Sequence, residues 1–228
     1  MKPSLPILLS INGGYVDTAG FLALQGLFTA HVTGNFVTAG AALVFGTSGV
    51  VGKLLALPVF CIVVAFVHLA GRVLAARGTP PLRALLLVKL VLLVAGAVMA
   101  VRLGPFPNGD TWPALLTGMT LVSAMAVQNG AQRAHLSSAA PTTLMTGNTT
   151  QVVIDLVDLL HGLPGPQSAA ARARLTGMLG NIVAFAAGCA AAAFFFAFTR
   201  MWCFAVPPLI ALAQVGVHAN LPAAVVPR

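Results

Sequence analysis

The sequence predicts an all-α integral membrane protein with about six transmembrane helices, two short re-entrant or broken helices, and two inverted repeats. Three observations predict this: few charges, long uncharged stretches, and a Thr-Gly-Asn motif that occurs twice. Of 228 residues, 58% are hydrophobic and 7% are charged, whereas soluble domains carry about 25% charged residues. Twelve basic and four acidic side chains cannot cover the surface of a soluble protein of this size, so the lipid bilayer is the expected partner.

Six stretches are apolar and long enough to cross a bilayer, which takes about 20 residues. They lie at about 4–24, 54–76, 84–103, 113–131, 175–199 and 201–219. Two further segments, at about 33–47 and 148–160, are more polar, and each would reach only about 20 Å as a helix. We expect one membrane domain over 1–228, with a first repeat at about 4–103 and a second at about 113–219.

The chain must turn back between the first two long stretches. Residues 18–52 contain no charged side chain, and one continuous helix of that length would be about 50 Å long. The break is expected within 29–35, because Gly34 frees the backbone and Thr33 or Asn35 can cap a new helix.

The two halves of the chain carry the same motif, 113 residues apart: Thr33, Gly34 and Asn35, and Thr146, Gly147 and Asn148. Each copy is followed by a short apolar segment and then by a long one. Pro141 interrupts the second half before the motif, since proline fits poorly inside a helix. The similar contexts predict an internal duplication.

Two topologies are compatible with these segments. If the short segments span the membrane, eight spans form parallel repeats, with five Lys and Arg inside and six outside. If the short segments enter and return on the same side, six spans form inverted repeats. Three basic residues then lie outside, and eight lie inside: Lys2, Arg72, Arg77, Arg83, Arg133, Arg172, Arg174 and Arg228. Cytoplasmic loops are enriched in Lys and Arg, so the inverted arrangement is favoured, with both termini cytoplasmic.

Asp17 is the acidic residue inside the first stretch, in the glycine-rich segment 13–20. An acid within the membrane is a functional candidate by default. Alternatively, Asp17 pairs with Lys89 or Arg133, or caps a break in the first span. Tyr15, the only tyrosine, lines the same break or is an ordinary buried hydroxyl.

The two Thr-Gly-Asn turns offer hydroxyls, amides and unpaired backbone N–H groups, which suit a small anion or a polar neutral solute. The alternative is that they only cap two helices and lock the halves together. His31 precedes the first turn and either titrates or fills a cavity. Leu144 occupies the matching place in the second half, which argues against a symmetric proton relay.

Asn129 forms a polar patch with Gln128, Gln132 and Arg133 on the stretch before the second turn, near the level of Asp17 in the first half. Arg133 either neutralises a bound anion or pairs with Asp17.

No enzyme, cofactor, metal or nucleic-acid site is expected. The sequence has no Ser-His-Asp, H-E-x-x-H or P-loop pattern, and its basic residues are scattered rather than interleaved with aromatics. Asp155, Asp158 and His161 share one side of a helix and mark its emergence into water. Close helix packing or a homodimer interface is expected over 175–199, which contains Gly177, Gly180 and Gly188.

The chain resembles the YoaK family of bacterial inner-membrane proteins. The resemblance is carried by Gly-Tyr-Val-Asp-Thr-Ala-Gly-Phe at 14–21, His-Val-Thr-Gly-Asn at 31–35 and Met-Thr-Gly-Asn at 145–148. It covers nearly the whole chain and implies a multi-pass inner-membrane protein with about six spans, but no substrate, because the family is a domain of unknown function. The characteristic stretch falls on Gly14, Asp17, Thr33, Gly34 and Asn35.

We therefore expect a transporter or channel for a small polar or anionic solute. Its substrate-binding residues are expected to be Asp17, Tyr15, Gly14, Thr33, Gly34, Asn35, Asn129, Arg133, Thr146, Gly147 and Asn148. The alternative is a membrane scaffold or sensor that transports nothing, in which the same polar groups only hold helices together.

Overall fold

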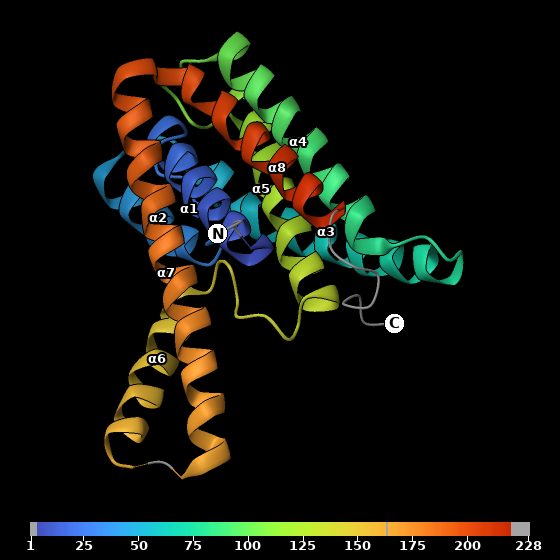
Figure 1. The fold of residues 1–228 in the computed structure, drawn as a ribbon. Helices are drawn as coiled ribbons and strands as arrows, with labels where there is room; N and C mark the ends of the chain where they lie inside the picture. The colour runs from blue at the N-terminus through green and yellow to red at the C-terminus, as the bar shows by residue number, and fades with distance from the viewer. Residues whose placement is uncertain (1–3, 163, 220–228) are drawn as a thin grey trace.

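The computed structural model describes residues 4–162 and 164–219, and within these ranges the chain is helical with no β-strand (Figure 1). Its elements are α1 Leu5–Ala23, α2 Gly34–Phe45, α3 Val50–Ala76, α4 Pro81–Leu103, α5 Trp112–His135, α6 Met145–Leu160, α7 Gly165–Thr199, the 3₁₀ helix η1 Arg200–Ala205, and α8 Val206–Ala219. The predicted all-α class is confirmed. Lys2 and Arg228, which enter the charge count, lie outside the described residues.

Two central helices, α1 and α5, connect the rest of the bundle. α1 packs against α7 and α8, whereas α5 packs against α3 and α4. Among the described helices, α2 packs only on α3, and α6 only on α7. The two halves of the chain therefore make equivalent contacts: α5, α6, α7 and α8 take the places of α1, α2, α3 and α4, and the reverse.

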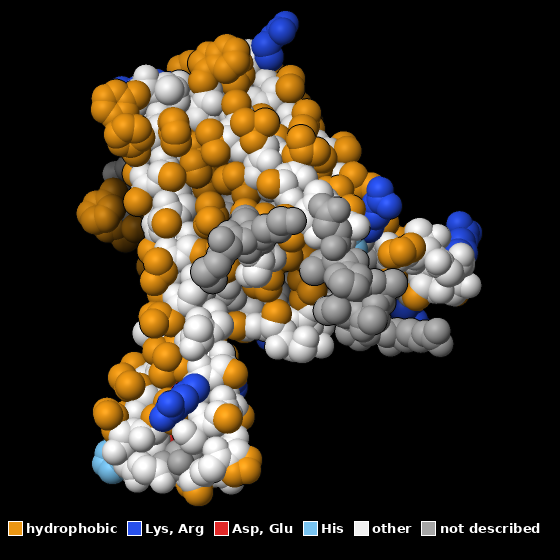
Figure 2. Space-filling model, in the orientation of Figure 1, with side chains coloured by type: hydrophobic (Ala, Val, Ile, Leu, Met, Phe, Trp, Pro, Cys, Tyr) orange, Lys and Arg blue, Asp and Glu red, His pale blue; other side chains and the backbone are white. Residues whose placement is uncertain are grey.

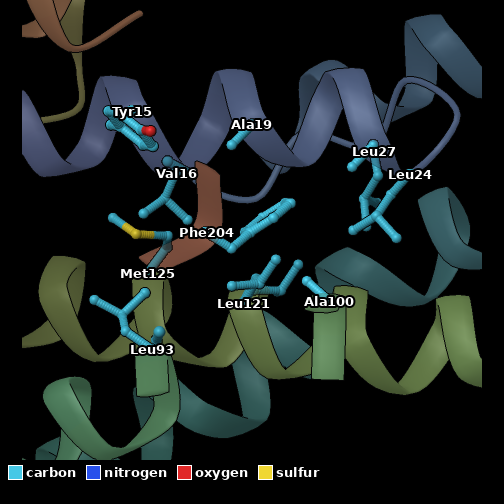
Figure 3. Packing of buried hydrophobic residues seen from close by; sticks show 14 of the residues in the cluster. Tyr15, Val16, Ala19, Leu24, Leu27, Leu93, Ala100, Leu121, Met125 and Phe204 are labelled. Carbon is cyan, nitrogen blue, oxygen red and sulfur yellow. The ribbon is translucent and has the colours of Figure 1, made fainter. Parts of the chain in front are cut away.

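The central helices run in opposite directions. Gly13 of α1 lies against Gln128 of α5, whereas Leu27, beyond the end of α1, lies against Gly118 near the start of α5. Figure 3 shows the same order, with residue numbers rising along α1 in the direction in which they fall along α5. α1 and α7 run in the same direction, and so do α5 and α3.

The apolar core lies between α1, α4 and α5. Phe204 of η1 is 1% exposed and fills the space between these helices, where its ring lies between Ala19 of α1 and Leu121 of α5 (Figure 3). The short 3₁₀ helix therefore belongs to the core rather than to a surface connection.

The outer surface is apolar, and polar side chains lie inside. Hydrophobic side chains are spread over the face that Figure 2 shows, where few charged ones are visible, and large exposed ones include Phe36, Phe45, Phe66, Phe198 and Leu209. By contrast, Lys89, Gln128 and Gln214 are buried. This distribution is the reverse of that in a soluble protein, and it is expected where lipid is the solvent.

Three helical stretches of the described chain are long and apolar enough to cross a membrane: Val50–Ala76, Pro81–Leu103 and Gly165–Ala219, which joins α7, η1 and α8. The chain is thus a helical protein of the membrane type. The largest difference from the expected boundaries is at α7, which begins at Gly165 rather than near residue 175. In addition, α3 begins at Val50 rather than near residue 54, and the expected stretch 201–219 is divided between η1 and α8.

The earlier start of α7 creates a hairpin with α6, which projects from the body of the bundle (Figure 1). Asp155 of α6 pairs with Arg174 of α7, with 2.7 Å between Oδ1 and a guanidinium nitrogen, and Gln151 donates to the same carboxylate. Asp155 is therefore part of an ion pair that holds the hairpin together.

Candidate functional site

The segment between α1 and α2 folds back along α1. Gln25 and Gly26 adopt left-handed backbone, with φ of 56° and 82°, and this reverses the chain. Thr29 then lies against Gly20, where a Cβ would meet the threonine Cγ2 at 2.7 Å. Residues 29–31 consequently lie beside the middle of α1 rather than beyond its end.

Asp17 holds this folded-back segment. Its Oδ1 accepts hydrogen bonds from the backbone N–H groups of Thr29 and Ala30, both at 2.7 Å, and from that of His31 at 3.4 Å. Its Oδ2 lies 2.7 Å from Nδ1 of His31. One buried carboxylate thus satisfies the backbone of the segment and orients an imidazole.

The pairings considered for Asp17 at the sequence level are wrong. Its partner is His31, and neither Lys89 nor Arg133 bonds to it. Asp17 also caps no break within α1, because α1 is continuous from Leu5 to Ala23.

The segment between α5 and α6 folds back along α5 in a similar way, but amides and hydroxyls replace the carboxylate. Thr142 donates to Gln132 at 2.7 Å and accepts from Gln128 at 3.2 Å. Thr143 donates to Oδ1 of Asn129 at 2.7 Å. The polar patch on α5 therefore anchors the second segment.

The two folded-back segments meet at His31 and Thr143. The His31 ring lies close to the backbone of Thr143, and it packs edge-on against Phe185 of α7 at 5.4 Å. The side chain of His31 is 36% exposed, whereas that of Asp17 is 5% exposed. The imidazole is therefore the accessible part of a buried polar pair.

The asparagines of the two Thr-Gly-Asn motifs each hydrogen-bond to the backbone seven residues earlier. Asn35 exchanges two hydrogen bonds of 2.8 Å with the backbone N–H and C=O of Phe28, seven residues earlier. Asn148 donates to the C=O of Pro141, also seven residues earlier, at 2.7 Å. Proline has no N–H, so the second bond cannot form there. Each asparagine closes its own folded-back segment, and both are 1% exposed.

The remaining residues of the motifs lie elsewhere. Thr33 occupies the N-cap position of α2, but its side chain is exposed and makes no cap hydrogen bond, so the expected cap is wrong. Asn35 does not cap α2 either, because its side chain bonds to Phe28. Thr146 and Gly147 lie exposed on the first turn of α6, and Gly34 begins α2 against the ring of Phe28.

Three other predicted residues lie away from the junction of the segments. Tyr15 donates to the carbonyl of Cys203 at 3.0 Å and lies in the core. A Cβ on Gly14 would collide with the carbonyl oxygen of Phe185, so this glycine permits close packing of α1 on α7. Arg133 is exposed at the other end of the polar patch. The structure brings together Asp17, His31 and, through Thr143, Asn129.

The threonines that anchor the segments were not among the residues predicted from the sequence. Thr29 and Thr142 are 113 residues apart, the spacing of the two Thr-Gly-Asn motifs. Extending the repeat alignment upstream of the motifs would have identified this pair.

A buried lysine connects the second segment to the outer helices. Lys89 of α4 donates to the side-chain oxygens of Gln128 and Gln214, from α5 and α8. Gln128 in turn donates to Thr142. No carboxylate of the described chain bonds to Lys89, so neutral oxygens alone solvate its amine.

Comparison with known proteins identifies a family. The model of a family described as "Protein of unknown function (DUF1275)" matches residues 5–217. No curated protein and no solved structure matches the chain. Because the match includes both folded-back segments and nearly every helix, the chain belongs to DUF1275, the uncharacterised family that contains the YoaK-like proteins.

Proposed function

We propose that this protein is a transporter or channel for a small polar or anionic solute, with the solute site where the two folded-back segments meet. The observation that carries the proposal is the imidazole of His31, which is about one third exposed and is held by Asp17 close to Thr143 of the other half. Irregular backbone at membrane depth is tolerated where protein buries it or where it lines a watery cavity.

Inverted repeats and six spans are part of the proposal. Parallel repeats of four spans would run α1 and α5 in the same direction, and their antiparallel course supports the inverted arrangement. The equivalent contacts of the two halves and the seven-residue bonds of Asn35 and Asn148 support a duplication. The spans are then α1, α3, α4, α5, α7 and α8, in a bacterial inner membrane with both termini cytoplasmic.

The helices that follow the junction favour an anionic or polar solute. α2 begins at Gly34 and α6 at Met145, directly after the residues that meet. Helix N-termini carry partial positive charge, and inverted-repeat carriers direct such ends at their substrates.

Transport rather than catalysis is proposed for the Asp17–His31 pair. Among the described residues, the polar contacts of the imidazole are the Asp17 carboxylate and the Thr143 backbone. Catalytic triads need a side-chain nucleophile bonded to the histidine, and none of the described side chains fills that role here.

Water access at His31 tests the proposal. Cysteine replaces His31 in a chain whose Cys61, Cys189 and Cys203 are alanine, and a membrane-impermeant thiol reagent is applied to native membranes. Thiols react as thiolates, and burial in apolar surroundings raises the thiol pKa and so slows the reaction. We expect His31→Cys to react at least about tenfold faster than the two controls described next.

The controls are Val16→Cys, at a position 0% exposed beside Asp17, and Phe66→Cys, at a position 65% exposed on the apolar surface. Labelling of Val16→Cys measures the reaction rate in the buried core, and labelling of Phe66→Cys measures it at a lipid-facing position. Equal protection of all three cysteines would overturn the proposed path.

One observation favours a second candidate, a scaffold or sensor without transport. The amides of Asn35 and Asn148 are buried and hydrogen-bonded to backbone, as expected of groups that only maintain the fold. A scaffold predicts that the junction stays dry, so the labelling experiment separates the two functions.

A further inference from the structure

A cavity of about 670 Å³ lies between α3 and α5 and reaches Asn129, the residue that anchors Thr143 of the second segment. One wall is a stripe of α3 from Phe60 to Ala75, and the other is the last two turns of α5 with Leu144. α3 and α5 run in the same direction here, since Val67 lies against Gly130 and Gly71 against His135. The cavity is therefore a long groove that follows both helices.

The groove is basic at one end. Arg72, Arg133, His68 and His135 line it, and no Asp or Glu does so among the described residues. Neither guanidinium has an ion-pair or hydrogen-bond partner within the described chain. His135 Nε2 is buried and has no hydrogen-bond partner there either. Two arginines without a partner in the described chain form a site for an anion.

The other end of the groove is apolar. Phe60 and Val64 lie two to three turns from Arg72 along α3, a distance of about 12–18 Å. The exposed neighbours on α3, such as Ile62, Phe66 and Leu69, belong to the apolar outer surface. The groove thus runs from an apolar wall between helices to a pair of arginines.

We propose that this groove binds an anionic phospholipid, with the phosphate between Arg72 and Arg133 and an acyl chain along Phe60 and Val64. Basic pockets between transmembrane helices bind anionic headgroups, and the planar guanidinium matches phosphate in a bidentate way. A free phosphate ion would satisfy the arginines but not the apolar length. The inference does not rest on the proposed transport function.

Native mass spectrometry of the purified full-length protein tests the proposal. The protein is titrated with phosphatidylglycerol, with phosphatidylcholine of the same acyl chains, and with inorganic phosphate. We expect phosphatidylglycerol to bind at least about tenfold more tightly than phosphatidylcholine, and millimolar inorganic phosphate not to displace it. In R72Q/R133Q this preference disappears.

Two further variants keep the result interpretable. Arg77→Gln removes a charge from the same end of α3 but outside the groove, and we expect it to retain the preference. Val64→Trp fills the apolar end and leaves both arginines in place, and we expect it to weaken phosphatidylglycerol binding.

Three results would overturn the inference. One is unchanged phosphatidylglycerol binding in R72Q/R133Q, and another is an equal loss in Arg77→Gln, which would mean diffuse attraction to the surface. The third is displacement of the lipid by inorganic phosphate together with normal binding in Val64→Trp, which would mean a free-anion site.

Discussion

The Asp17 carboxylate stabilises two features. Its Oδ1 accepts hydrogen bonds from backbone N–H groups of the first folded-back segment, and its Oδ2 orients His31. Replacement by alanine leaves these buried donors without an acceptor, which costs roughly 1–3 kcal/mol for each group. We expect Asp17→Ala to lower the free energy of unfolding by about 3 kcal/mol, and Asp17→Asn, which keeps one oxygen, by about 1 kcal/mol. Denaturation of the purified protein in detergent measures both. Equal stability of Asp17→Ala and wild type would refute the anchoring role.

The two motif asparagines should contribute differently to the free energy of unfolding. Asn35 makes two hydrogen bonds to the backbone of Phe28, whereas Asn148 makes one to Pro141. We expect Asn35→Ala to cost about 2 kcal/mol of unfolding free energy and Asn148→Ala about 1 kcal/mol. Thr33→Ala is the matched control, because that exposed side chain makes no cap bond, and it should stay within about 0.5 kcal/mol of wild type. The reverse order would contradict the assignment of these bonds.

At the residue scale, the sequence identified the groups but not their partners. Asp17, Asn35 and Asn148 are conspicuous because polar residues are rare in such an apolar chain. Their partners depend on the chain reversal at Gln25 and Gly26, which brings residue 31 beside residue 17. Periodicity along one helix carries no information about that reversal.

The pairing of α1 with α7 depends on two glycines. A Cβ on Gly188 would collide with the carbonyl oxygen of Ile11, as one on Gly14 would with that of Phe185. Backbone atoms cannot move aside as side chains do, so we expect Gly188→Ala to cost about 2–3 kcal/mol. Thermal unfolding in detergent checks this.

Gly177 provides the control on the same helix, because no atom lies within 4 Å of a Cβ placed there. Gly177→Ala should be neutral or stabilising by up to about 1 kcal/mol, since alanine favours helix. Similar losses at both positions would mean that the close approach at Gly188 is not required. The close packing expected for residues 175–199 is thus confirmed at Gly188, and the contact lies within one chain.

At the element scale, the sequence predicted the approximate positions of the helices and of the second break. The first break was expected within 29–35, but α1 already ends at Ala23 and the chain reverses at Gln25 and Gly26. The hydropathy signal is strongest in α3, α4 and α7–α8, which are the stretches that qualify as spans. α1 and α5 are weaker because other helices surround them, so they carry polar residues such as Asn12 and Gln128. The extent of α7 was not predictable, since its first ten residues lie in the projecting hairpin with α6.

The side of the membrane on which each connecting turn lies distinguishes six spans from eight. In the six-span arrangement, the turns at Gly78 and Gly162 lie on the same side of the membrane and Asn108 lies on the opposite side. In the eight-span arrangement, Gly162 lies on the same side as Asn108, opposite Gly78. We expect cysteines at Gly78 and Gly162 to be protected from an impermeant reagent in intact cells and a cysteine at Asn108 to be labelled. Labelling at Gly162 would refute the inverted arrangement.

Solute flux through purified protein in liposomes tests the central claim most directly. The account predicts that a class of small anions or polar neutral solutes enters wild-type proteoliposomes faster than empty liposomes. It also predicts that His31→Ala slows this entry at least about tenfold, a change of about 1.4 kcal/mol in the barrier, while Gly177→Ala does not. Equal flux in His31→Ala and wild type, or no flux above empty liposomes for any solute tested, would contradict it.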